Sequence, residues 1–192
     1  MSKRAWFLCG GPCVGKNALG EILSARGYYP ISTGELLRGC DDDVAKRIVQ
    51  NGYPAKDSLV IRLLSEEVLA KLGSKIAVRG APRTVRQAEF LIDLLKKNHG
   101  YHISVAWLES NYDEAMRDLL RKNGGTIDPT RASLIRMRQE QHERRCMDLI
   151  RYLKKHCDRF HMIRENALDQ GTIGTDLLEI ISEKEDDFEF VG

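Results

Sequence analysis

Short apolar runs alternate with longer amphipathic stretches along almost the whole chain. The apolar runs predict buried strands at residues 5–9, 28–31, 76–78, 103–108 and 160–163. Helical spacing and capping residues predict helices at 18–25, 33–37, 44–50, 58–72, 86–97, 113–121, 132–156 and 175–182. Strands that alternate with helices predict an α/β fold, a doubly wound five-stranded parallel sheet with helices on both faces. A ligand of such a sheet binds at the carboxyl ends of its strands.

Composition narrows the class of protein without identifying it. The 192 residues suit one domain, and 42% hydrophobic with 30% charged residues is ordinary for a globular protein. A formal net charge of +2 gives no general attraction to nucleic acid or membrane, and no apolar run is long enough to span a bilayer. Five cysteines without a CxxC pair predict free thiols in the cytoplasm. We expect a monomer, since no predicted element demands a partner.

The first predicted strand leads into a glycine-rich loop. Gly10, Gly15 and Lys16 match G-x-x-x-x-G-K, with a strand before and a helix after. In such a loop, backbone N–H groups and the helix N-terminus surround phosphate oxygens, and the lysine adds a full charge. The candidate ATP phosphate-binding residues are Gly10, Gly11, Pro12, Cys13, Val14, Gly15, Lys16, Asn17 and Ala18.

No metal site is predicted. His142 and Cys146 lie four residues apart on a predicted helix, but two such residues are more often ordinary surface chemistry than metal ligands.

Two downstream segments carry a family resemblance. Residues 31–38, ISTGELLR, and 80–89, GAPRTVRQAE, resemble signature segments of adenylate kinases, which are nucleoside monophosphate kinases. Arg117, Arg121, Asp128 and Arg136 resemble pieces that flank the lid in the short-lid form. The motifs occur in the family's order, and the resemblance runs from about residue 4 to about residue 180.

The resemblance implies a P-loop NTPase-type fold that moves the γ-phosphate of ATP onto a nucleoside monophosphate, with Mg²⁺ brought by ATP. It implies one domain over 1–192, with its core at 1–34, 54–121 and 131–182. A small helical acceptor-binding insertion is expected at about 35–53 and a short lid at about 122–130.

The resemblance also assigns roles to individual residues. It places Thr33, Arg38, Arg83 and Gln87 at the monophosphate, with the arginines on its phosphate and the other two beside its base. The expected catalytic residues are Lys16, Arg83, Arg121 and Arg136. Arg138 competes with Arg136, although it points to a different face of the predicted helix.

The acceptor is expected to be AMP. Relatives that prefer UMP or CMP usually carry Ala and Asn at the positions of Thr33 and Gln87. A glutamine amide offers both a donor and an acceptor, which suits the edge of adenine.

Three departures from the family pattern bear on catalysis. Asn17 and Ala18 stand where the family has Gly and Thr, so a hydroxyl is missing. Arg79 stands where the family has the aspartate that anchors the water shell of Mg²⁺. The lid has no clear counterpart of its first arginine and only Asp128 of the usual aspartate pair.

These departures leave alternatives open. One is a working enzyme in which Arg79 neutralises phosphate charge. Another is a catalytically impaired nucleotide-binding relative that acts as a sensor or partner protein. A third is a P-loop kinase for a non-nucleotide acceptor, against which Gln87 argues.

Overall fold

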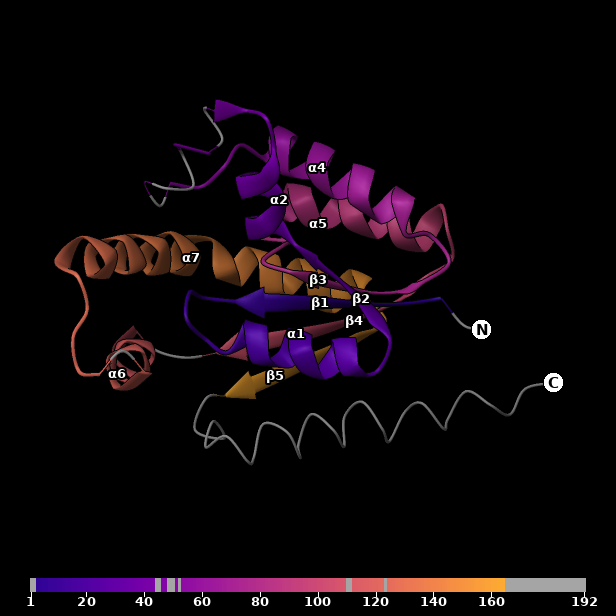
Figure 1. The fold of residues 1–192 in the computed structure, drawn as a ribbon. Helices are drawn as coiled ribbons and strands as arrows, with labels where there is room; N and C mark the ends of the chain where they lie inside the picture. Colours follow the sequence, from indigo (N-terminus) through magenta and orange to yellow (C-terminus); the bar gives the residue numbers. More distant parts are fainter. Residues whose placement is uncertain are drawn as a thin grey trace.

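A five-stranded parallel sheet forms the centre of the molecule (Figure 1). The computed structural model describes residues 3–43, 46–47, 51, 53–109, 112–122 and 124–164. The strands are β1 (Arg4–Gly10), β2 (Tyr28–Ser32), β3 (Lys75–Arg79), β4 (His102–Glu109) and β5 (Arg159–Arg164), in the order β2-β3-β1-β4-β5. Every pairing is parallel. The predicted doubly wound sheet is therefore confirmed.

Alternation along β1 explains why helices cover both faces of this sheet. Ala5, Phe7 and Cys9 point into one apolar cluster, whereas Trp6 and Leu8 point into the other. Helix α1 (Lys16–Ala25) covers the second face. Helices α4 (Asp57–Ala70), α5 (Val85–Ile92) and α7 (Pro129–His156) cover the first.

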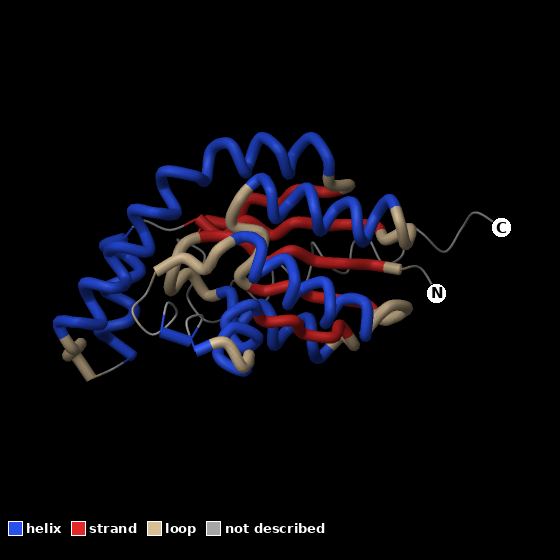
Figure 2. The backbone as a smooth tube through the Cα atoms, turned by 90° about the horizontal axis from the view of Figure 1, so that it is seen from above, coloured by secondary structure: helices blue, strands red, loops and turns tan. Residues whose placement is uncertain are grey.

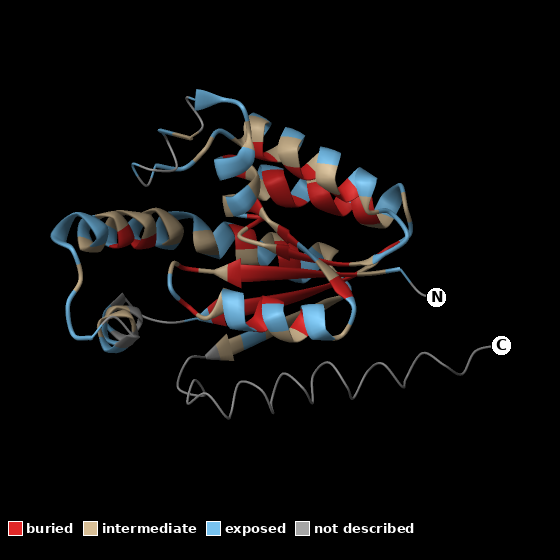
Figure 3. Cartoon of the chain, viewed as in Figure 1, coloured by how far each residue is buried: buried red, intermediate tan, exposed pale blue. Residues whose placement is uncertain are grey.

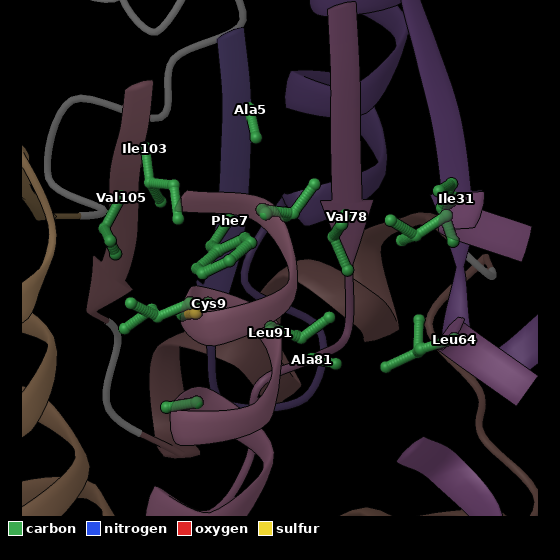
Figure 4. Packing of buried hydrophobic residues seen from close by; sticks show 14 of the residues in the cluster. Ala5, Phe7, Cys9, Ile31, Leu64, Val78, Ala81, Leu91, Ile103 and Val105 are labelled. Carbon is green, nitrogen blue, oxygen red and sulfur yellow. The ribbon is translucent and has the colours of Figure 1, made fainter. Parts of the chain in front are cut away.

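The larger cluster holds the helices of the first face against the sheet. Phe7 and Val78 come from adjacent strands and meet Leu91 of α5, while Leu64 of α4 packs toward Ile31 (Figure 4). All five side chains are at most 1% exposed. Burial of an aliphatic or aromatic side chain of this size stabilises the fold by about 1.5–3 kcal/mol.

Most predicted boundaries agree with the structure to within a few residues. The stretch expected as one helix at 86–97 is α5 followed by a π-helical segment, η1 (Asp93–Lys97). The helix expected at 44–50 lies largely outside the described residues, and the one expected at 175–182 lies wholly outside them.

Two short helices lie near the carboxyl ends of the strands. Helix α2 (Thr33–Gly39) follows β2 directly, and Ser32 caps it by accepting from the Glu35 N–H at 3.4 Å. Helix α6 (Tyr112–Lys122) follows β4. The first half of α7 extends with α6 beyond the strand ends, as Figures 1 and 2 show. That part of α7 is mostly exposed or half-buried, while the central strands β1, β3 and β4 are largely buried (Figure 3).

Candidate functional site

The phosphate loop makes a tight turn between β1 and α1. Gly10, Cys13 and Gly15 all have positive φ, at 129°, 62° and 73°. A Cβ on Gly10 would lie 2.2 Å from the carbonyl oxygen of Leu108, so the loop starts in direct contact with β4. Among the residues that the structure describes, no side chain caps the N-terminus of α1. The turn and the uncapped helix end form the arrangement that binds phosphate.

Lys16 closes over the loop that precedes it. Its ammonium donates to the carbonyl oxygens of Gly11 and, at 3.1 Å, of Gly10. The positive charge is therefore held at the mouth of the loop, where phosphate oxygens can take over as its acceptors.

Helix α7 covers the outer side of the loop. Gln139 is 6% exposed and donates to Glu143 Oε1 at 2.9 Å, while its own Oε1 lies against Gly11. A Cβ on Gly11 would come within 2.6 Å of that oxygen. A larger residue at position 11 would displace the end of the Gln139 side chain, which packs α7 against the loop. No motif in the sequence indicated this contact.

His142 lies one turn further along α7, between the loop and β4. Its ring stacks on Trp107 with centroids 5.4 Å apart. Burial, followed by the charges of Lys16 and Arg83, lowers the pKa of His142 to about 4. The imidazole is therefore neutral at pH 7. The loop lysine and the arginine after β3 therefore both lie near this ring.

Arg83 belongs to the loop that follows β3. Its Nε donates to the carbonyl oxygen of Gly80 at 2.8 Å, which orients the guanidinium. Arg83 is exposed over part of its surface. Desolvation by the surrounding chain is the main cause that lowers its pKa from the ordinary value, and the charge of Arg138 is the second. The guanidinium still stays charged at neutral pH.

The two competing arginines of α7 lie in different surroundings. Arg138 is half-buried and close enough to Arg83 to affect its pKa, whereas Arg136 is exposed. The helical twist separates the two side chains, because residues two apart point to different faces. Arg138 therefore lies with the cations of the site.

Arg79, at the end of β3, is paired. Its Nη2 donates to Glu35 Oε1 at 2.7 Å, and its guanidinium lies against Gly20 of α1. Glu35, whose N–H donates to the Ser32 cap of α2, thus binds Arg79 with its carboxylate. The pair joins the sheet to the first turn of α2.

Thr33 and Arg38, expected at the acceptor, both lie on α2. Thr33 is 5% exposed, and its Oγ1 has no hydrogen-bond partner in the described part of the chain. Thr33 Oγ1 and Arg83 Nη2 lie 3.9 and 3.6 Å from the point where Gly80 would carry a Cβ. Thr33 and Arg83 are thus brought together. Arg38 is exposed and folds back over Gly34, where a Cβ would lie 3.3 Å from Nη1.

Gln87, in the first turn of α5, is 3% exposed and already hydrogen-bonded. Its Oε1 accepts from the Arg83 N–H at 2.8 Å, and its Nε2 donates to Asp57 Oδ1 at 2.7 Å. Asp57, which the motifs did not single out, is therefore part of the site's support.

Residues expected around the lid lie on the part of the molecule beyond the strand ends. Arg121 is exposed near the end of α6. Asp128 caps α7 by accepting from the Arg131 N–H at 3.0 Å. The sequence assigned Asp128 to the lid, and the structure adds this capping role.

The described residues contain no group of three or more His, Cys, Asp or Glu that could hold a metal ion. His142 and Cys146 are not joined as ligands, since His142 stacks on Trp107 and the Cys146 thiol donates to the carbonyl oxygen of Glu143 at 3.3 Å. Within the same part of the chain, no helix combines the length and the apolar character needed to cross a membrane.

Comparison with known proteins finds adenylate kinases. The chain is 34% identical over 122 residues to an adenylate kinase of Azobacteroides pseudotrichonymphae, a match covering 59% of this chain and 63% of that protein. It is 30% identical over 129 residues to that of Thermus thermophilus, covering 62% and 66%. It is 31% identical over 126 residues to that of Leptospira biflexa, covering 62% and 67%. The chain thus spans slightly less than two thirds of the first two relatives. No protein-family model matches it.

Proposed function

The chain belongs to the adenylate kinase family, and we propose that it moves the γ-phosphate of ATP to a nucleoside monophosphate, with AMP as the preferred acceptor. The observation that carries the proposal is the contact between the end of β1 and the loop after β3, where the Cys9 thiol, just before the phosphate loop, donates to the carbonyl oxygen of Pro82, just before Arg83, at 3.8 Å. The charges of Lys16 and Arg83 both lower the pKa of His142, which agrees with this contact. A cation from the donor loop and one from the expected acceptor site thus act on the same space. Transfer between two bound nucleotides requires such a shared space.

The chain's own groups would do the binding. The amides after Gly10 and the N-terminus of α1 would hold the ATP phosphates, and Lys16 would exchange its carbonyl contacts for phosphate oxygens. Arg83 would hold the acceptor phosphate from the other side. Phosphoryl transfer needs in-line positioning and positive charge on the equatorial oxygens, and little covalent help.

We propose Arg138 rather than Arg136 as the cation that α7 supplies, with Arg121 joining from α6. The interaction of Arg138 with Arg83 and the exposure of Arg136 support this choice. Two neighbouring guanidinium groups repel one another until a polyanion lies between them, so this arrangement favours a phosphorylated ligand.

We propose that Thr33, Arg38, Arg83 and Gln87 bind the monophosphate, with the insertion at about 35–53 and the lid at about 122–130 as the pieces that close over the substrates. The buried, unpartnered hydroxyl of Thr33 supports this, because an unsatisfied buried polar group is costly unless a ligand pairs with it. Closure would exclude water, which competes as phosphoryl acceptor.

Adenylate kinases generally use ATP with Mg²⁺, but the residues of this chain do not fit a protein-anchored ion. Arg79 occupies the end of β3 and is bound to Glu35, and Asn17 and Ala18 offer no hydroxyl after Lys16. Mg²⁺ would therefore arrive as part of the ATP complex, and no catalytic step is assigned to a protein-held metal.

The second candidate is a nucleotide-binding relative with impaired transfer, which would act as a sensor or partner protein. The Arg79–Glu35 pair favours it, because a carboxylate able to hold the metal's water shell is absent from that position. UMP or CMP as acceptor is the remaining variant of the kinase proposal. We further propose a cytoplasmic monomer, on the free thiols of all five cysteines and the modest net charge.

A coupled assay of ADP formation from ATP, AMP and Mg²⁺ tests the proposal. Wild-type turnover should exceed that of Lys16→Ala by at least about 100-fold. Calorimetric titration of ATP and AMP into the same proteins separates the two candidates. Binding of both nucleotides with turnover no higher than in Lys16→Ala would establish the impaired relative. The absence of AMP binding would overturn the acceptor assignment.

A further inference from the structure

A partly buried polar network joins the first turns of α4 and α5. Asp57 is the first residue of α4, and Thr84 is the N-cap of α5. The Thr84 hydroxyl donates to Asp57 Oδ2 at 3.0 Å and accepts from the Gln87 N–H at 3.2 Å. Asp57 Oδ1 accepts from Gln87 Nε2 at 2.7 Å. One carboxylate thus serves two helix N-termini, where negative charge is favoured.

The partners of Gln87 determine which way round its amide lies. A carboxylate only accepts hydrogen bonds, so the group that faces Asp57 must be the donor, Nε2. A backbone N–H only donates, so the group that faces Arg83 N must be the acceptor, Oε1. Reversal of the amide would set oxygen against carboxylate and N–H against N–H. The orientation is therefore enforced at both ends.

Each end of the amide keeps one bonding function for a ligand. Nε2 has two hydrogens, of which Asp57 takes one, and Oε1 has two lone pairs, of which Arg83 N–H takes one. A base that pairs with both must offer an amino N–H to Oε1 and a ring-nitrogen lone pair to Nε2. The amino edges of adenine and cytosine have this pattern, whereas the 6-oxo edge of hypoxanthine or guanine and the 4-oxo edge of uracil have the inverse.

We propose that Asp57 is a specificity-determining positioning residue, which locks the Gln87 amide so that the acceptor site selects amino bases over oxo bases. The inference rests on the proposed function, because it concerns the acceptor of that same site. Asp57 acts through Gln87 and needs no contact with the nucleotide.

Equilibrium binding of AMP, IMP, CMP and UMP to the wild-type chain is the first test, measured by calorimetry without ATP. AMP and IMP differ at the 6-position and in the protonation of N1. AMP should bind on the order of 10- to 100-fold more tightly than IMP, since IMP leaves both amide functions unsatisfied. CMP should likewise bind more tightly than UMP, because cytosine has the amino edge and uracil the oxo edge. Equal affinity of the wild type for AMP and IMP would overturn the inference without any variant.

The variant Asp57→Asn tests the lock itself. An asparagine can donate to a reversed Gln87 as well as accept from the present one, so only the Arg83 N–H contact still opposes reversal. The AMP-to-IMP affinity ratio should fall by about tenfold. Glu66→Gln is the matched control, because it removes one negative charge from the exposed face of the same helix and disturbs only the pair with Arg62 at 3.5 Å. The control should keep the wild-type ratio.

The outcomes separate the inference from the function on which it rests. If no monophosphate binds the wild type, the proposed acceptor function fails and the inference fails with it. If AMP binds and Asp57→Asn changes stability but leaves the ratio within about twofold of wild type, Asp57 is merely structural and only the inference fails. If Asp57→Asn does not fold, Gln87→Met replaces it and should also abolish the preference. A retained preference in Gln87→Met would overturn the inference.

Discussion

Arg79 Nη2 lies 2.7 Å from Glu35 Oε1. The arginine that stands in place of the family's aspartate is therefore paired with a carboxylate from α2. Replacement of aspartate by arginine changes the charge at position 79 by two units. Glu35 offsets part of this change, because its negative charge lies beside Arg79. Arg79 side-chain exposure is 21% and that of Glu35 is 63%, which makes this a partly screened pair.

A double-mutant cycle with Arg79→Met and Glu35→Gln should give a coupling energy of about 0.5–1 kcal/mol in urea unfolding, because the pair is partly exposed. The coupling energy should be smaller in 1 M salt, because the Debye length is then only about 3 Å and exposed charges are screened. The more exposed Arg62–Glu66 pair, at 3.5 Å, is the control and should give about 0.3 kcal/mol. Equal coupling in the two cycles would contradict a special role for the Arg79 pair.

Replacement of Arg79 by aspartate should strengthen the Mg²⁺ dependence of ATP binding and raise turnover. The single variant sets a second carboxylate beside Glu35, so the like charges repel and the effect is best seen in Arg79→Asp combined with Glu35→Gln. ATP affinity with and without Mg²⁺ is the measurement. If neither the Mg²⁺ dependence of ATP binding nor the turnover rate changes, the charge at position 79 has no effect on Mg²⁺ bound with ATP.

Arg138→Ala should lower kcat/KM for ADP formation by about 100- to 1,000-fold, as loss of a cation from a phosphoryl-transfer site commonly does. Arg136→Ala, which changes the same residue type two positions away on an exposed face, should cost less than about threefold. Steady-state kinetics of the two variants checks this. A larger loss of kcat/KM in Arg136→Ala than in Arg138→Ala would assign the catalytic role to Arg136 instead.

Gly10→Ala should destabilise the fold by about 2–4 kcal/mol, because the added methyl meets the Leu108 carbonyl and φ is 129°. Gly39→Ala is the control, since no described residue has an atom within 4 Å of the added Cβ at that position. It should change the unfolding free energy by less than about 1 kcal/mol. Similar losses in both variants would show that contact with β4 does not constrain the loop.

Stability should fall on acidification through His142. The pKa of its ring is about 4 in the folded chain, against an ordinary value of 6.5. The unfolded chain therefore binds a proton that the folded chain does not. The stabilisation is fully present above pH 6.5 and is lost as the pH falls toward 4, in total on the order of 3 kcal/mol.

His142→Phe keeps an aromatic ring for Trp107 and removes the titration. The difference in unfolding free energy between wild type and variant should therefore change between pH 6.5 and 4 and level off above 6.5. Chemical denaturation at several pH values is the measurement. Parallel profiles over that window would mean that His142 already titrates near its ordinary pKa when folded.

The chain's periodicity by itself determined the strands, their alternation with helices and the phosphate loop, because apolar runs, helical spacing and glycine–lysine spacing are local properties. The family segments likewise assigned Thr33, Arg83 and Gln87 to elements that the structure brings together, since parallel strands end at one edge.

Only the tertiary structure decided the contacts between elements distant in sequence. The fold brings Arg79 to Glu35, 44 residues away in the sequence. It likewise brings Gln87 to Asp57, 30 residues away. Arg138 and Arg136 differ only in the folded chain, where Arg138 is half-buried near Arg83 and Arg136 is exposed. Pairings of this kind depend on the relative placement of whole helices, which side-chain periodicity does not encode.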